Sequence, residues 1–402
     1  MPSSLFKDLN IKGDIFTDDS KRVIYATDAS AYREKPLGVA WPVDEEDIRA
    51  IIRFAHHHKI NLIPRGAGTS LAGQVVGNGL VVDVSRYMNK IIEVNSEERW
   101  VRVQPGVVLD ELNLFLKPYG LFFAPETSTS NRCVIGGMIG NNSSGLHSLI
   151  YGTTREHLLA VRSILSNGEI AEFGRLSGSE FDAKCQGDKL ENKIYRQIRN
   201  LLSDSSRRKK IDEEYPDPVV VRRNTGYALD VLKKSLVFDK REEGDFNFCR
   251  LIAGSEGTLV FVTEAKLNLL PLPPREKALV CVHFNSVMEA IKGNLIALKY
   301  NPGAVELMDR KILELTRENI EQRKNRFFIN GNPGAILMIE FARDDIKEIN
   351  ALSRDLESEL REANLGYHFP VITGDNIKKV WNLRKAGLGV LSNMPGDAKP
   401  VS

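Results

Sequence analysis

Hydrophobic residues recur at helical spacing in the first hundred residues of the chain. Ile48, Ile51, Ile52 and Ala55 follow this spacing within residues 42–59, and Asp44 stands where the N-cap of a helix is expected. We also expect helices over residues 108–116, 191–203, 287–300 and 345–363. Residues 204–218 are expected to form a polar connector.

Short apolar runs predict strands between these helices. They lie at residues 62–63, 80–84, 91–94, 100–103, 259–262, 278–284, 304–308 and 335–341. A further apolar run, residues 155–166, ends at Asn167-Gly168, a hairpin-turn pair, and residues 169–173 follow it. The mixture of short strands and helices predicts an α+β fold.

A proline-rich segment divides the chain. Pro271-Leu272-Pro273-Pro274 is typical of a linker, so we expect one domain over residues 1–273 and another over residues 274–402. The second domain has the order β-α-β-β-α. This order predicts a ferredoxin-like antiparallel sheet with helices on one face.

Composition and charge narrow the function classes. The chain has 402 residues, 42% of them hydrophobic, and a net charge of +2, which supports a sizeable core and gives no reason to expect nucleic acid as a partner. It has no signal-peptide pattern and no apolar run near the roughly 18 residues of a membrane span. The four cysteines lie far apart, which favours reduced thiols in a cytoplasmic protein.

Histidines and cysteines give no metal site. His56, His57 and His58 are neighbours on a predicted helix end, where they point in different directions, so we expect a solvated helix end. Cys133 is expected to be a buried apolar residue. No metal is expected in this chain.

The most informative segment follows the strand at residues 62–63. It is Pro64-Arg65-Gly66-Ala67-Gly68-Thr69-Ser70-Leu71-Ala72-Gly73. Glycines permit tight turns and bring bare N–H groups near a ligand, and successive N–H groups form a concave anion site. Arg65, Thr69 and Ser70 add donors suited to a pyrophosphate. The segment leads into a strand and not a helix, so it is neither a Rossmann turn nor a Walker loop.

Two more segments repeat this theme. Residues 135–145 contain Gly136, Gly137, Gly140 and Gly145 between apolar neighbours, and we interpret them as a second loop. Residues 253–260 carry Gly254-Ser255-Glu256-Gly257. Three such segments favour one extended ligand with several hydrogen-bonding regions, and a flavin dinucleotide fits that description.

The order of these motifs resembles a known family. Together with Gln104-Pro105-Gly106 and Tyr151-Gly152-Thr153, they resemble the FAD-linked oxidases of the vanillyl-alcohol oxidase / p-cresol methylhydroxylase (PCMH) superfamily. Within it the chain is similar to the branch of D-lactate dehydrogenases, D-2-hydroxyglutarate dehydrogenases and the glycolate oxidase flavin subunit. The resemblance implies a PCMH-type FAD-binding domain of two subdomains, followed by part of a ferredoxin-like cap domain.

The glycine-rich segments and the resemblance together assign the FAD contacts. The expected cofactor-binding residues are Pro64, Arg65, Gly66, Ala67, Gly68, Thr69, Ser70, Gly73, Gln74, Pro125, Thr127, Gly136, Gly137, Asn141, Ser144, Gly145, Tyr151, Gly152, Gly254, Glu256 and Gly257. Many members of the superfamily attach the flavin to a histidine in the first loop. Thr69 stands at that position here, so non-covalent FAD is expected.

The resemblance also implies substrate-binding residues. In the D-2-hydroxy-acid branch an arginine after Trp-x-Leu and a later lysine hold the substrate carboxylate, and Arg384 and Lys399 match these positions. A hydroxyl residue of the family is Leu388 here, which leaves the substrate open. The family's catalytic base and metal-binding histidines lie in motifs that this chain lacks. We therefore expect a fragment of a longer protein, with its base beyond Ser402.

These observations favour an FAD-dependent oxidoreductase that converts a small D-2-hydroxy acid to the 2-keto acid by hydride transfer to flavin N5. An iron–sulfur domain or protein is the implied electron acceptor, and a partner of this kind could bring the chain to the inner membrane. Two alternatives stay open. One is an FAD-binding module or electron-transfer scaffold without catalysis, and the other is an enzyme like the cell-wall enolpyruvyl-glucosamine reductase.

Overall fold

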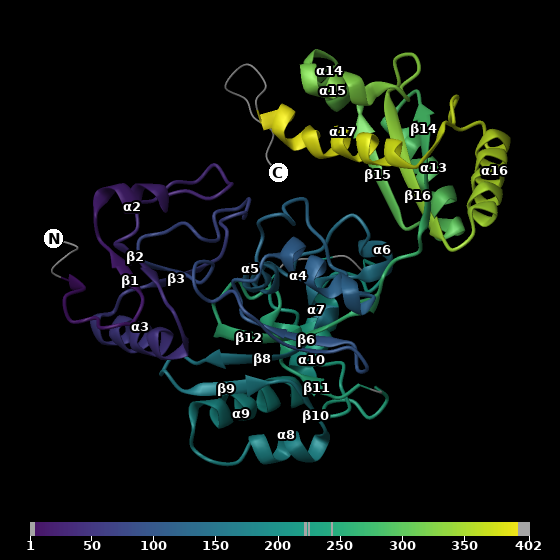
Figure 1. The fold of residues 1–402 in the computed structure, drawn as a ribbon. Helices are drawn as coiled ribbons and strands as arrows, with labels where there is room; N and C mark the ends of the chain where they lie inside the picture. Colours follow the sequence, from purple (N-terminus) through teal and green to yellow (C-terminus); the bar gives the residue numbers. More distant parts are fainter. Residues whose placement is uncertain (1–4, 221–222, 224–225, 243, 393–402) are drawn as a thin grey trace. The chain divides into compact units, whose positions relative to one another are not determined.

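The computed structural model describes residues 5–220, 223, 226–242 and 244–392. The chain forms two compact units (Figure 1). The first unit contains Met1–Gly145 and Gly152–Pro271, and the second contains Leu146–Tyr151 and Leu272–Ser402. The division after Pro271 lies within the proline-rich segment. The expected domain over residues 1–273 did not anticipate that residues 146–151 belong to the second unit.

The first unit begins with a small four-stranded sheet. Its order is β1 (Asp14–Phe16), β2 (Gly38–Trp41), β4 (Leu80–Asp83) and β3 (Leu62–Arg65), and the last three strands run parallel. Helix α3 (Glu45–His58) connects β2 to β3, and its apolar side is buried beside the sheet. A shorter helix, α2 (Asp19–Ile24), precedes β2.

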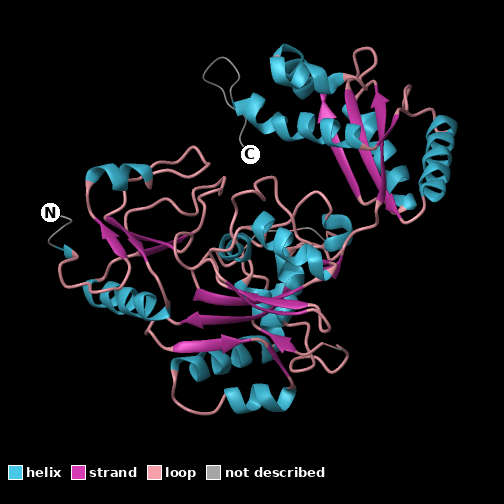
Figure 2. Ribbon diagram, viewed as in Figure 1, coloured by secondary structure: helices cyan, strands magenta, loops and turns pink. Residues whose placement is uncertain are grey.

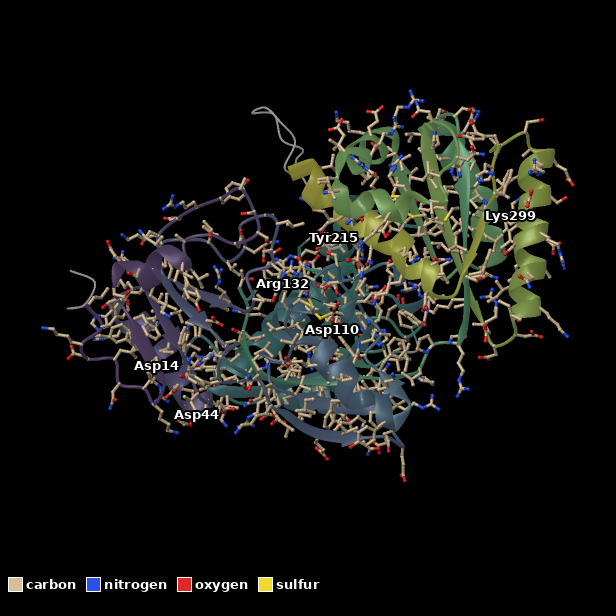
Figure 3. The ribbon with its side chains drawn as sticks, turned by 45° about the horizontal axis from the view of Figure 1, so that its top comes forward. Asp14, Asp44, Asp110, Arg132, Tyr215 and Lys299 are labelled. Atoms are coloured by element: carbon tan, nitrogen blue, oxygen red, sulfur yellow. The ribbon has the colours of Figure 1, made fainter. Side chains whose placement is uncertain are left out.

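Helix α3 forms where its capping residues predict. The Asp44 carboxylate, labelled in Figure 3, accepts a hydrogen bond from the Asp47 N–H at 3.1 Å. Lys59 adopts a left-handed conformation that ends the helix, and its N–H bonds back to the carbonyls of Ala55 and His56. The predicted helix over residues 42–59 is therefore confirmed in substance, with both ends trimmed.

The rest of the first unit is built around a five-stranded antiparallel sheet. Its order is β5 (Ile91–Asn95), β6 (Trp100–Val103), β12 (Phe261–Asn268), β8 (Leu158–Ile164) and β9 (Ile170–Phe173). In the view of Figure 2, helices lie both above and below these strands. The other elements of this unit are α4 (Leu109–Leu116), β7 (Leu121–Phe122), α5 (Ile135–Asn141), α7 (Thr154–His157), β10 (Arg175–Leu176), α8 (Gly178–Lys184), α9 (Leu190–Ser203), α10 (Ser205–Glu214), α11 (Leu229–Leu232), β11 (Phe246–Asn247), α12 (Cys249–Ile252) and β13 (Leu270–Pro271).

Two sequence expectations in this unit are wrong. Residues 205–214, expected to belong to a polar connector and not to a helix, form helix α10, which the Asp204 carboxylate caps by accepting from the Arg207 N–H at 3.0 Å. Good helix formers such as arginine and lysine then extend it although only Ile211 is buried. The second glycine segment, expected to be a loop, begins with the short helix α5.

The second unit is built on a four-stranded antiparallel sheet. Its order is β15 (Ala304–Asp309), β16 (Ala335–Arg343), β14 (Glu276–Phe284) and β17 (Val371–Thr373). Helices α13 (Val287–Ala297) and α16 (Ile346–Glu362) pack on one face, and Lys299, labelled in Figure 3, pairs with Glu359 of α16. The remaining helices are α6 (Ser148–Tyr151), α14 (Arg310–Glu318), α15 (Ile320–Arg323) and α17 (Asp375–Ser392).

Helices cover both faces of this sheet, although the sequence predicted one. Along β14 the residues Ala278, Val280, Val282 and Phe284 face α13 and α16, while Leu279 and Cys281 face α14 and α17. The strand is therefore buried on both sides, which explains its nearly continuous apolar sequence. The overall fold class, α+β, is as predicted.

No helix in the described part of the chain combines the length and the apolar character that a membrane crossing needs. The four cysteines are free and buried. Burial raises the pKa of the Cys133 thiol, which fits the apolar role expected for it.

Candidate functional site

A cleft lies in the first unit, where three glycine-containing segments meet. The end of β3 with the segment after it, the helix α5, and the segment before β12 with the first residues of β12 contribute most of its lining. The lining residues are Pro64, Arg65, Gly66, Ser70, Gln74, Val75, Val84, Pro105, Gly136, Gly137, Ile139, Gly140, Asn141, Ile252, Ser255, Glu256, Gly257, Val260, Phe261 and Val262. Segments about 190 residues apart in sequence thus share one cavity.

Glycines allow the first two segments to touch. A Cβ atom on Gly66 would lie 2.3 Å from Cγ2 of Val134, just before α5, and a Cβ atom on Gly136 would lie 2.7 Å from Cβ of Pro105. Neither distance is tolerated between real atoms. The bare main chain at these two positions is therefore a condition for the close packing that forms this side of the cleft.

The third segment is fastened to α5 by its main chain. The N–H of Gly254 donates to the carbonyl of Ile139 at 2.9 Å, and the N–H of Glu256 donates to the carbonyl of Gly140 at 2.9 Å. Gly257 has a φ of 73°, which favours glycine, and a Cβ atom there would lie 3.0 Å from Cγ of Pro64. The segment therefore contacts both other segments and closes the rim.

Arg65 lines the cleft in a different way from the one its sequence suggested. Its guanidinium Nη2 donates to the carbonyl of Thr27 at 2.8 Å, and Nη1 donates to the carbonyl of Val75 at 3.3 Å. The charged group also lies over the Tyr25 ring, and burial lowers its pKa. Arg65 thus ties the loop to neighbouring parts of the chain, and its role as a phosphate donor stays a prediction.

Ten of the predicted cofactor residues line the cleft, and the others lie elsewhere. Those outside the lining are Ala67, Gly68, Thr69, Gly73, Pro125, Thr127, Ser144, Gly145, Tyr151, Gly152 and Gly254. Thr127, for example, pairs with Cys133 through its hydroxyl at 3.2 Å, and Tyr151 belongs to the second unit.

Sequence reasoning missed much of the apolar half of the cleft. Val75, Val84, Ile139, Ile252, Val260, Phe261 and Val262 line it. Such residues have the same pattern as any core residue, so the sequence carried no signal for them. Pro105 and Ser255 did lie inside recognised motifs and could have been included.

The lining fits a large ligand with an aromatic ring and polar groups. Apolar side chains make up much of the lining, and the polar side chains among them include Ser70, Gln74, Asn141 and Ser255. A Cβ atom on Gly137 would meet only Cγ2 of Val134, at 3.9 Å. A larger side chain at Gly137 would therefore enter space that a ligand can use.

The second unit holds the predicted substrate residue Arg384 on α17. Its Nε and Nη2 donate to Oε2 of Glu306 on β15, at 3.0 and 2.6 Å. Val380 and Leu383 of the same helix are buried against the sheet, so the helix is held firmly beneath Arg384. Lys399 lies outside the described residues.

A buried carboxylate stands beside this pair. Glu340 on β16 is 2% exposed, and it accepts hydrogen bonds from Nε2 of His147 at 2.8 Å and from Nε1 of Trp381 at 3.1 Å. Nζ of Lys277 lies 3.3 Å away. Burial alone would raise the pKa of Glu340, but these donors together bring it below its usual range.

Comparison with known proteins identifies the class. Residues 36–174 match a family described as FAD binding domain, and residues 273–402 match one described as FAD linked oxidases, C-terminal domain. The chain therefore contains an FAD-binding domain and a C-terminal domain of FAD-linked oxidases, and its cofactor is FAD.

Individual relatives are longer than this chain. It is 35% identical over 400 residues to D-2-hydroxyglutarate dehydrogenase of Pseudomonas putida, covering 97% of this chain and 38% of that protein. It is 28% identical to glycolate oxidase subunit GlcD of Bacillus subtilis, covering 76% of this chain and 53% of that protein. A solved structure of alkyldihydroxyacetonephosphate synthase shares the fold, with a TM-score of 0.64 at 15% identity over 98% of this chain and 63% of that one.

Proposed function

We propose that the protein oxidises a small D-2-hydroxy acid, of the lactate, glycolate or 2-hydroxyglutarate type, to the corresponding 2-keto acid. The observation that carries the proposal is the cleft formed by three distant glycine segments, in a chain 35% identical to a D-2-hydroxyglutarate dehydrogenase over 97% of its length. Bound FAD supplies the hydride acceptor of such a reaction at its N5 atom.

The residues of the first unit have a holding role in this proposal. The main-chain N–H groups of the glycine segments and the side chains of Ser70, Gln74 and Asn141 would hold the polar parts of the cofactor. Val84, Ile139 and Phe261 would exclude water from its aromatic part. We propose that the cofactor is held without a covalent bond, because the hydroxyl of Thr69 cannot form the histidyl link of other family members.

The substrate carboxylate is assigned to Arg384. A guanidinium presents paired N–H groups that match a carboxylate, and Lys399 is the second cation implied by the family. No catalytic base is assigned to the described residues, and we propose that it belongs to the sequence that the longer relatives have beyond the matched region. We further propose an iron–sulfur domain or protein as electron acceptor and a cytoplasmic location, both on the resemblance alone.

The test is anaerobic reduction of the flavin in the full-length protein. We expect D-2-hydroxyglutarate, D-lactate or glycolate to bleach the flavin absorbance, and the L-enantiomers of the chiral acids to leave it unchanged. Arg384→Ala should keep the flavin content and raise the KM for the acid roughly 10- to 100-fold, because it removes hydrogen bonds to a charged group.

Three outcomes separate the hypotheses. Bleaching by one of these acids supports the proposal. A flavin that is bound but reduced by no 2-hydroxy acid would leave an FAD-binding module or scaffold as the better account. Bleaching by NADPH, followed by electron transfer to an enolpyruvyl sugar, would favour the reductase alternative.

A further inference from the structure

Two glutamates lie on the same face of the second unit's sheet. In the pairing of β15 with β16, Glu306 stands opposite Met338, and Glu340 is two residues further along β16. Side chains alternate between faces along a strand, so Glu306 and Glu340 share the face that α17 covers. Carboxylates on such a covered face need partners, and α17 supplies them.

The partners on α17 are Trp381 and Arg384. They are three residues apart, so both side chains project from the same side of the helix. Trp381 donates to Glu340, and Arg384 donates to Glu306. The helix is therefore attached to the sheet by two polar contacts one turn apart, in addition to its buried apolar residues.

The contact at Arg384 uses one edge of the guanidinium. Both donors, Nε and Nη2, converge on the single oxygen Oε2 of Glu306. Nη1 bonds to none of the described residues. The Arg384 side chain is 39% exposed, whereas that of Glu306 is 19% exposed, so the less exposed partner holds the more exposed one. The end of the fork, formed by Nη1 and the second hydrogen of Nη2, is left for another acceptor.

We infer that Glu306 is a positioning residue that fixes the Arg384 guanidinium with its free edge turned toward the substrate carboxylate. This inference rests on the proposed function. An unattached arginine loses side-chain freedom when it binds a ligand, and that loss weakens binding. Two hydrogen bonds to Glu306 already hold Arg384 in one orientation before the substrate binds. Less side-chain freedom is therefore lost on binding. Glu306 itself contacts no substrate.

The test compares Glu306→Ala with Glu306→Gln in the full-length protein. We expect Glu306→Ala to raise the KM for the hydroxy acid about tenfold and to leave kcat within about twofold. The contact between Arg384 and the substrate carboxylate is present in both the ground state and the transition state, and loss of such a contact affects KM alone. Glu306→Gln keeps an acceptor oxygen for Nε and Nη2 and should recover most of the wild-type KM. The Kd of the 2-keto acid product, from its perturbation of the flavin spectrum, should follow the same order.

The opposite result has a clear physical meaning. Glu306 also places a negative charge near the site, so if repulsion of the substrate were its main effect, both variants would bind the acid more tightly. That result would overturn the inference, as would an unchanged KM in Glu306→Ala.

A double-mutant cycle separates positioning from structure. In an Arg384→Ala background, Glu306→Ala should have no further effect on KM, because there is no guanidinium left to position. Additive effects would show that Glu306 acts on stability or on another residue. If Glu306→Ala does not fold, Glu306→Met takes its place in the cycle, because it keeps a side chain of similar length without an acceptor oxygen for the guanidinium.

Glu348→Ala is the matched control. Glu348 also pairs with an arginine of this unit, Arg343, at 2.9 Å. Removing it should leave KM unchanged. If Arg384→Ala raises KM while both Glu306 variants behave as wild type, only this inference fails. If no 2-hydroxy acid reduces the flavin, the proposed function fails, and the inference fails with it.

Discussion

Gly137 occupies a place in the cleft where the absence of a side chain serves the ligand and not the packing. Its neighbour Gly136 must be glycine because Pro105 lies too close, but a Cβ atom on Gly137 would have only Val134 nearby. The two adjacent glycines therefore have different physical roles. One allows the protein to close, and the other keeps the cleft open.

This difference predicts the effect of Gly137→Leu. The leucine side chain should fill the cleft without a collision in the protein, so the variant should fold and purify with less than about one tenth of the wild-type FAD, because the side chain would occupy space that the cofactor needs. Circular dichroism checks the fold, and the ratio of flavin to protein absorbance checks occupancy.

Gly178→Leu is the matched control. Gly178 lies on α8 and does not line the cleft, and a Cβ atom there would meet no atom within 4 Å. This variant should therefore keep its full flavin content. Normal flavin occupancy in Gly137→Leu would show that the cleft is not the cofactor site.

At the scale of elements, His283 joins three segments of the second unit. It lies on β14 and is fully buried. Its ring Nδ1 lies 2.9 Å from the carbonyl of Cys281, and its Nε2 accepts from the N–H of Asn330 at 3.2 Å. Its main chain pairs with His368. These contacts place the proton on Nδ1, so the ring is neutral, and a second proton on Nε2 would face the N–H of Asn330.

A pH dependence of stability follows. Burial lowers the pKa of His283 from 6.5 to about 4. Between these values the unfolded chain binds a proton that the folded chain does not, so folding stability falls as pH falls from about 6.5 to about 4. The shift corresponds to roughly 3 kcal/mol at most. Urea unfolding at several pH values should show a smaller loss in His283→Gln than in the wild type.

The exposed helix-end residue His57 provides the comparison. His57→Gln should lose stability with falling pH as the wild type does. Equal pH profiles for His283→Gln and the wild type would contradict the assignment of this part of the pH dependence to His283.

Elements with a clear hydrophobic period were predictable, and those determined by distant contacts were not. Helix α3 was predictable from the Asp44 cap and the spacing of its isoleucines. Helix α5 was not predictable, because its glycines indicate a loop and contacts with neighbouring segments fix its conformation. The glycine rim of the cleft was visible in the sequence, but the apolar wall was not. Glu306 was invisible as a partner because it lies 78 residues from Arg384.

At the scale of the whole molecule, the chain enters the second unit twice. Residues 146–151 leave the first unit directly after Gly145 and return at Gly152, long before the chain passes to the second unit at Leu272. This short insertion carries His147, whose Nε2 donates to the buried carboxylate of Glu340. The second unit therefore takes one partner of a buried carboxylate from a segment that lies within the sequence of the first unit.

This arrangement predicts a local effect of His147→Ala on the second unit. The change leaves Oε1 of Glu340 with Lys277 as its partner in the described part of the structure, and a buried charged group that loses a hydrogen bond costs about 1–3 kcal/mol. Amide hydrogen exchange should accelerate in β14 and β16 and stay unchanged in β12 of the first unit. His57→Ala should change neither. Unaltered exchange in β16, or an equal acceleration in both units, would show that residues 146–151 do not contribute to the stability of the second unit in particular.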